Sequence, residues 1–181
     1  MKLLICSDIH GDAVSAEKIL DAFERHGADR LIILGDILYH GPRNDLPAGY
    51  APKRVIELLN PYHNKILAVR GNCDAEVDQM VLDFPILADY AFLDVDGLNI
   101  LLTHGHVINK SACPQLREGD ILLHGHTHVP VAEAFGANNY YVNPGSASIP
   151  KENSPKSYIF YSDKRFEFFS LDGEKYKELA L

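Results

Sequence analysis

The sequence lacks any long apolar segment and any regular arrangement of cysteines. The apolar run from Leu3 to Cys6 gives way at once to Ser7. It is too brief for the core of a signal peptide, and no stretch approaches the length needed to cross a membrane. The three cysteines, Cys6, Cys73 and Cys113, are odd in number and far apart, which fits a reducing compartment better than a disulfide framework. We therefore expect a cytoplasmic protein.

Positive charge is also scarce. The chain has 17 lysines and arginines against 25 acidic residues, a formal net charge of -8. Nucleic-acid backbones and anionic membranes call for clustered Lys and Arg, and the sequence shows no basic or aromatic stripe. We expect neither partner, and a nuclease activity is disfavoured for the same reason.

The totals describe an ordinary globular protein. With 181 residues, 46% of them hydrophobic, the chain can bury a substantial core without disulfides. No linker, internal repeat or low-complexity segment interrupts it. We predict a single domain over residues 1–181.

The first half alternates buried strands with amphipathic helices. Strands are predicted at residues 2–6, 31–34 and 65–69. Asp12 is a candidate N-cap for the first helix and Gly27 its end. An irregular, proline-rich segment at 39–52 precedes the second helix. This order is typical of a parallel sheet with right-handed crossovers, whose site lies beyond the carboxyl ends of the strands.

After residue 74 the pattern changes to shorter strands. Phe92 to Val95 and Leu98 to Thr103 flank a hairpin signal at Asp96-Gly97. Further strands are predicted at 121–123, 140–142, 157–161 and 165–171, the last two as a hairpin. The tail from residue 172 shows no pattern.

Side chains suited to metal binding follow directly after these strands. Considered singly, each has an ordinary explanation as a helix cap, a turn residue or a partly buried histidine. Their joint placement is harder to dismiss, because the fold brings such strand ends together. His124, His126 and His128 also alternate, so their rings can face one point. The candidates are Asp8, His10, Asp36, Asn72, His104, His126 and His128.

Five blocks in order resemble the calcineurin-like metallophosphoesterase family. They are Asp8-x-His10, Gly35-Asp36, Gly71-Asn72, His104-Gly105 and Gly125-His126-Thr127-His128. Segments 41–44, 70–74 and 143–146 are similar to the YfcE-type phosphodiesterases within that family. The resemblance implies an α/β fold, a two-layered β-sandwich flanked by helices, enclosing a dinuclear metal centre.

The resemblance also implies which residues hold each metal. The first ion would take Asp8, His10, Asp36 and His128, and the second Asp36, Asn72, His104 and His126. Mixed carboxylate, amide and imidazole ligands suit Mn²⁺, Fe or Zn²⁺ alike, and the absence of ligating cysteine disfavours a structural zinc site. We expect two divalent ions, Mn²⁺ first, with Fe, Zn²⁺ or Ni²⁺ as alternatives.

The implied activity is the hydrolysis of small phosphodiesters. Two ions about 3.5–4 Å apart would deprotonate a bridging water for in-line attack on phosphorus, and their charge would offset the acidity of the chain. The alternatives are a phosphomonoesterase of the same family and a non-catalytic scaffold, like the retromer subunit that shares the fold. A scaffold would be expected to lack ligands, whereas here every matched position is filled. The family also includes homo-oligomers, although nothing in the sequence marks an interface.

The chain departs from the family after Gly71-Asn72, where histidine is common and Cys73 stands instead, with Asp74 retained. A thiol is a weak hydrogen-bond donor, so we expect a preference for good leaving groups, unless Cys73 is merely a small residue near the site. Arg43 could bind a substrate phosphate, or be an exposed loop arginine. Cys73, Asp74 and Arg43 are the catalytic candidates.

The remaining candidates are less specific. His40 lies in the same loop as Arg43 and is another candidate for phosphate contact. His106 and His124 are neighbours of implied ligands, and a hydrogen bond to a ligand, simple proximity or direct metal coordination would explain each of them equally well. The segment Asn143 to Ser146 is expected to line the site or to pack beneath it.

Overall fold

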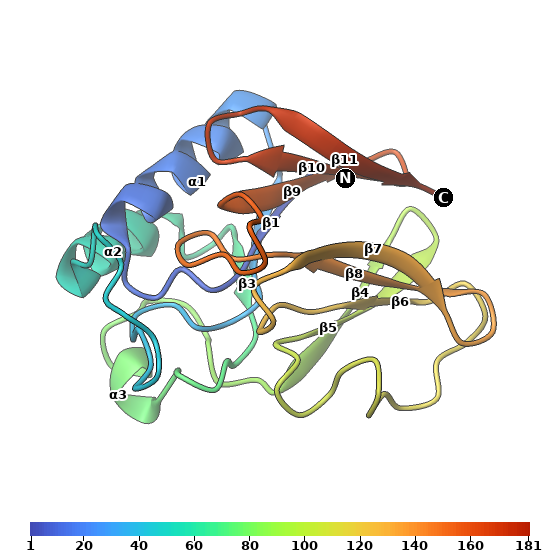
Figure 1. Cartoon of the computed structure of the whole chain (residues 1–181), viewed down its shortest axis with the longest axis horizontal. Coiled ribbons are helices and arrows are strands. Elements are labelled where there is room, and N and C mark those ends of the chain that lie inside the picture. The colour runs from blue at the N-terminus through green and yellow to red at the C-terminus, as the bar shows by residue number, and fades with distance from the viewer.

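Two β-sheets packed face to face form the protein, as a computed structural model of residues 1–181 shows (Figure 1). The six-stranded sheet has the order β11-β10-β9-β1-β2-β3 and the five-stranded sheet the order β4-β5-β6-β8-β7. The predicted α/β sandwich is confirmed. The six-stranded sheet contains β1 (Leu3–Cys6), β2 (Arg30–Ile33), β3 (Ile66–Ala68), β9 (Ser157–Ser162), β10 (Arg165–Ser170) and β11 (Lys175–Ala180). The five-stranded sheet contains β4 (Tyr90–Val95), β5 (Leu98–Thr103), β6 (Ile121–Leu123), β7 (Pro130–Phe135) and β8 (Asn139–Pro144).

Strand β1 shows how the layers are built. Alternate side chains of a strand point to opposite faces. Leu4 and Cys6 accordingly join the apolar cluster beneath the helices, while Leu3 and Ile5 join the cluster between the two sheets. All four are buried, which explains why the strand appears in the sequence as an unbroken apolar run.

The two longer helices cover the outer face of the six-stranded sheet (Figure 1). Helix α1 (Ala13–His26) begins as predicted at Asp12, whose carboxylate accepts two backbone N–H groups, and ends at Gly27 in the left-handed conformation. Helix α2 (Pro52–Leu59) starts with proline at its first turn, where the missing N–H costs nothing. The 3₁₀ turn η1 (Asn60–Tyr62) and the short helix α3 (Glu76–Gln79) follow. None of the helices has the length and apolar character needed to span a bilayer.

Four elements were not predicted: η1, α3, β7 and β11. Strands β7 and β11 both lie at the edge of a sheet. Their exposed sides carry charged and small residues, as in the sequence Lys-Tyr-Lys-Glu-Leu-Ala of β11, which keeps an edge from pairing with other chains but removes the apolar pattern of a buried strand. The tail that showed no pattern therefore forms the outermost strand of the six-stranded sheet.

Candidate metal centre

The structure brings all seven candidate ligands together where the sheets meet at the carboxyl ends of their parallel strands. Strands β1, β2 and β3 run parallel in one sheet, and β5 and β6 run parallel in the other. Asp8 and His10 follow β1, Asp36 follows β2 and Asn72 follows β3, while the other three histidines follow β5 and β6. This is the convergence expected from the strand ends.

One half of the cluster is deeply buried. The Asp8 Oδ1 atom lies 3.2 Å from His128 Nε2 and 3.6 Å from His10 Nε2. The two imidazole Nε2 atoms are themselves 3.4 Å apart. All three side chains are almost completely shielded from solvent, so an ion held here would be enclosed.

The other half is more open. His104 Nε2 lies 3.1 Å from Asn72 Oδ1 and 3.2 Å from His126 Nδ1. Asn72 is exposed and His126 half-buried, whereas His104 is buried. The Asp36 Oδ2 atom lies 3.4 Å from His104 Nε2 and 3.6 Å from His10 Nε2, so its carboxylate faces both halves.

Backbone carbonyls orient three of the imidazoles. The Nδ1 atoms of His10, His104 and His128 lie 2.7, 2.6 and 2.7 Å from the carbonyl oxygens of residues 39, 34 and 149. A carbonyl only accepts hydrogen bonds, so each Nδ1 carries the proton and donates it. Each Nε2 therefore directs a lone pair into the cluster when the ring is neutral, as in metal-ligating histidines.

The donor set fits a divalent metal. Asp8 Oδ1 is buried and has no hydrogen-bond partner, and such an orphaned carboxylate oxygen is costly unless a cation or proton meets it. Converging imidazole lone pairs surround it. Three overlapping groups have ligand atoms close enough to hold an ion: Asp8 with His10 and His128, Asp8 with Asp36 and His104, and His10 with Asp36 and Cys73. The cluster is thus consistent with divalent metal binding.

In the metal-free protein, the carboxylates and imidazoles of the cluster strongly shift one another's pKa values. Burial opposes ionisation of Asp8, but the adjacent imidazoles hold its pKa well below the usual range. Burial would likewise lower the pKa of His104, yet the carboxylates of Asp36 and Asp8 raise it to about 9. The cluster attracts positive charge, whether supplied by protons or by metal ions.

The backbone around the ligands is held in an unusual conformation. Asp8, His10, Asp36, His126 and His128 all have positive φ angles, between 49° and 66°. Non-glycine residues seldom adopt this region, and they do so at functional sites where the surrounding structure enforces it. Five of seven candidate ligands share this strain, which supports the view that the fold is arranged around the site.

Two motif glycines permit the close approach of the ligand loops. A β-carbon on Gly71 would overlap the carboxylate of Asp36, and one on Gly125 would overlap Ser7 and the Asp8 carboxylate. Gly71 and Gly125 therefore each leave room for a candidate ligand that follows another strand.

Buried polar side chains hold the ligand loops from below. The Asp74 carboxylate accepts backbone N–H groups of Asp36, Ile37 and Gly71 at 2.8, 2.9 and 2.7 Å. It therefore lies beneath the site and does not line the cavity. The amide of Asn143 donates to the Gly125 carbonyl at 2.9 Å.

The segment after β8 supports the other sheet's loop. The hydroxyls of Ser146 and Ser148 both donate to the Asp8 carbonyl at 2.8 Å. Of the two places expected for the segment from Asn143 to Ser146, the structure shows packing beneath the site.

Cys73 and Arg43 lie at the cavity beside the cluster. The backbone N–H of Cys73 donates to Asp36 Oδ1 at 2.8 Å, and the amide of Asn72 donates to its sulfur at 3.2 Å. Burial, followed by the Asp36 charge, raises the pKa of the thiol, so the thiol stays protonated. Arg43 is exposed and pairs with no carboxylate of the protein.

The other histidines take secondary positions. The His124 ring is buried and stacks on Tyr141 with centroids 4.5 Å apart, and burial lowers its pKa to about 4. His106 is exposed, its ring 5.4 Å from that of His104. The ring of His40 packs edge-on against Tyr39.

The sequence did not indicate one residue of the polar cavity, Lys151. Lys151 lines the same cavity as Arg43, together with Asn44, beside Asp36 and His128. It follows no predicted strand and belongs to no motif block. A single lysine in a polar loop carries no signal that the sequence alone could have revealed.

Known proteins share both the sequence and the architecture. A family model, the calcineurin-like phosphoesterase superfamily domain, matches residues 1–164. The phosphodiesterase YfcE of Escherichia coli K12 is 51% identical over 158 residues, covering 87% of this chain and 85% of the relative. A phosphodiesterase of Methanocaldococcus jannaschii is 25% identical over 190 residues, covering 100% and 99%. The solved structure of the E. coli phosphoesterase YfcE superposes with a TM-score of 0.96 at 46% identity, over 99% of each chain. The chain belongs to the calcineurin-like phosphoesterase superfamily.

Proposed function

We propose that this protein hydrolyses small phosphodiesters at a centre of two divalent metal ions. Homology to YfcE makes the chain a phosphodiesterase, a hydrolase. The observation that carries the proposal is the unpartnered Asp8 Oδ1, buried among inward-facing imidazole nitrogens. A buried carboxylate among imidazoles is stabilised by a bound cation, whereas the same charged group without a partner would destabilise an apolar core.

The ligands divide into two sets that share Asp36. Asp8, His10, Asp36 and His128 would hold the enclosed ion, and Asp36, Asn72, His104 and His126 the more open one. We take the ions to be Mn²⁺, with Fe, Zn²⁺ and Ni²⁺ as alternatives, since mixed oxygen and imidazole donors suit all four. When bound, the ions would supply positive charge for the phosphoryl oxygens and an activated water as nucleophile.

The polar cavity beside the cluster is the place for the phosphate. It has a volume of about 320 Å³ and is lined by Arg43, Asn44 and Lys151 together with candidate metal ligands. A guanidinium can bind two phosphate oxygens at once. We assign Arg43 and Lys151 to orient the substrate anion, which a chain of net charge -8 needs local cations to attract.

Cys73 sets the leaving-group preference in this proposal. A protonated, weakly donating thiol assists a departing alkoxide poorly, so diesters with good leaving groups should be favoured over alkyl monoesters. In Cys73→His, the imidazole can protonate the leaving group. We expect this variant to hydrolyse poor leaving groups relatively faster, which a plot of kcat/KM against leaving-group pKa will measure. An unchanged slope would remove Cys73 from the mechanism.

Metal reconstitution tests the function itself. The chelated protein should hydrolyse bis(p-nitrophenyl) phosphate only after addition of Mn²⁺ or another of the named ions. The chelated protein without added metal and the metal without protein are the controls. Absence of hydrolysis with every ion would favour the scaffold alternative over the enzyme.

A further inference from the structure

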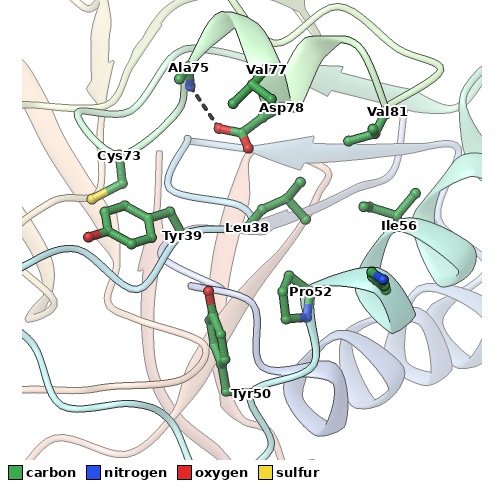
Figure 2. Close-up of a pocket in the computed structure, with 11 residues that line it drawn as sticks. Leu38, Tyr39, Tyr50, Pro52, Ile56, Cys73, Ala75, Val77, Asp78 and Val81 are labelled. Carbon is green, nitrogen blue, oxygen red and sulfur yellow. Dashed lines mark hydrogen bonds between the residues drawn. The ribbon is translucent and has the colours of Figure 1, made fainter.

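An apolar pocket adjoins the polar cavity. Its volume is about 400 Å³, within the range of small-molecule sites, and eight of its eleven lining residues are hydrophobic (Figure 2). The polar cavity, in contrast, has one hydrophobic residue among ten. Cys73 lines both, so the two compartments meet beside the candidate metal centre.

The aromatic wall of this pocket is fixed to a ligand loop. The carbonyl of Tyr39 accepts the hydrogen bond from His10 Nδ1, while the Tyr39 side chain lines the pocket (Figure 2). The Tyr50 ring packs against Gly11, in the turn after His10. The contact is so close that a β-carbon on Gly11 would overlap the ring. The pocket and the metal centre therefore keep a fixed relation.

The opposite end of the pocket is aliphatic. In Figure 2, Ile56 and Val81 appear at the end away from Cys73, with Val77 at the top of the view beside Asp78. Val77 and Val81 are 64% and 43% exposed, an apolar surface that a bound ligand would cover. The Asp78 carboxylate also lines the pocket, and one of its oxygens accepts the Ala75 N–H at 2.8 Å.

We propose that this pocket binds an apolar ester group of the phosphodiester, an aryl or similar flat group, while the phosphate lies in the polar cavity. The assignment rests on the proposed phosphodiesterase function. Two tyrosines and an aliphatic end match a flat apolar group, since aromatic rings pack well against each other and against aliphatic side chains. A sugar or another highly hydroxylated group would place hydroxyls against Leu38, Ile56 and the two valines, which offer no hydrogen bond. The polar groups of the lining are Lys53, the Asp78 carboxylate and the two tyrosine hydroxyls.

Two stable anions test the assignment by direct binding. Methyl phenylphosphonate and methyl methylphosphonate carry the same charge and differ by a phenyl ring. Titrated into the Zn²⁺-loaded protein and followed by backbone amide NMR, the phenyl compound should bind at least about tenfold more tightly. It alone should shift the amides of Val77 and Val81. Equal affinities would overturn the assignment.

Exposed pocket residues allow variants that leave the fold intact. The double variant Val77→Thr with Val81→Thr keeps side-chain shape and adds two hydroxyls. It should lower the preference for an aryl over a methyl diester by about tenfold in KM. The matched control is Met80→Gln, because Met80 is 83% exposed, lies between the two valines and does not line the pocket. It should retain the preference.

The outcomes separate this inference from the function on which it rests. Hydrolysis of diesters without aryl preference would overturn the pocket assignment and leave the phosphodiesterase intact. No hydrolysis of any diester would overturn the function and the substrate assignment together. A dimer in sedimentation velocity that Val77→Asp dissociates would show that a second copy covers the pocket, and would also overturn the assignment.

Discussion

The two sheets bring different chemistry to the candidate metal centre. The six-stranded sheet contributes every oxygen donor and one imidazole, from Asp8, His10, Asp36 and Asn72. The five-stranded sheet contributes imidazoles only, from His104, His126 and His128. Negative charge thus comes from one layer and neutral donors from the other. Neither sheet holds a metal site alone, so metal binding should depend on, and stabilise, the packing of one sheet on the other.

The largest expected effect comes from removing the shared carboxylate. Asp36→Asn should lower metal-dependent kcat/KM by more than about 100-fold, because it weakens metal binding at both proposed ion positions at once. The loss of a residue that only supports a ligand typically costs about 10- to 100-fold. His126→Gln, from the other sheet, affects only the open position and should retain more activity. Asp45→Asn, at an exposed position of the nearby loop, is the control and should leave kcat/KM unchanged. Equal losses of kcat/KM in Asp36→Asn and His126→Gln would contradict the proposed difference between the ligands of the two sheets.

The residues beneath the ligands provide the next test. Asp74→Asn replaces an acceptor of three N–H groups by a side chain with donors, and Asn143→Ala frees the loop that carries His126. We expect each to reduce Zn²⁺ affinity by about 10- to 100-fold, measured by competition with a chelating dye. A loss only in Asp74→Asn would mean that the five-stranded sheet needs no such support.

Taken per pH unit, the pH dependence of metal binding gives the smallest expected effect. The carboxylates of the six-stranded sheet raise the pKa of His104, on the five-stranded sheet, to about 9 in the metal-free protein. A metal must displace that proton. Apparent affinity should therefore rise by about tenfold per pH unit as pH increases toward about 9, and then level off. Calorimetry in two buffers of different ionisation enthalpy will count the released protons; release of none at pH 7 would contradict this coupling.

Much of the fold could be predicted because its signals are local. The apolar run at β1, the cap at Asp12, the stop at Gly27 and the Asp96-Gly97 turn each depend on a few neighbouring residues. Strand β11 could not be found this way, since at the edge of a sheet its charged residues face water. The partner that makes it a strand is β10, and no local pattern records that pairing.

The site divides in the same way. The positions of polar residues at strand ends indicated the candidate ligands, and the family resemblance divided these candidates into one set for each proposed metal ion. The support role of Asp74 was not visible, because two of its three hydrogen bonds come from Asp36 and Ile37, which lie far from it in sequence. The apolar pocket was equally hidden, since Tyr39, Ile56 and Val81 meet only after the chain has folded. Contacts between distant segments are what sequence patterns fail to record.

The position of β1 has a consequence for how the protein is made. This strand lies between β2 and β9, and two serines that follow β8 grip the Asp8 carbonyl. Strand β1 ends at Cys6 and β9 begins at Ser157, an interval that a ribosome crosses in about 8–30 s at typical rates of synthesis. During that time the first strand has one open edge and the metal centre is incomplete. The candidate ligands that follow β1 can therefore reach their final positions only after the last third of the chain has been synthesised.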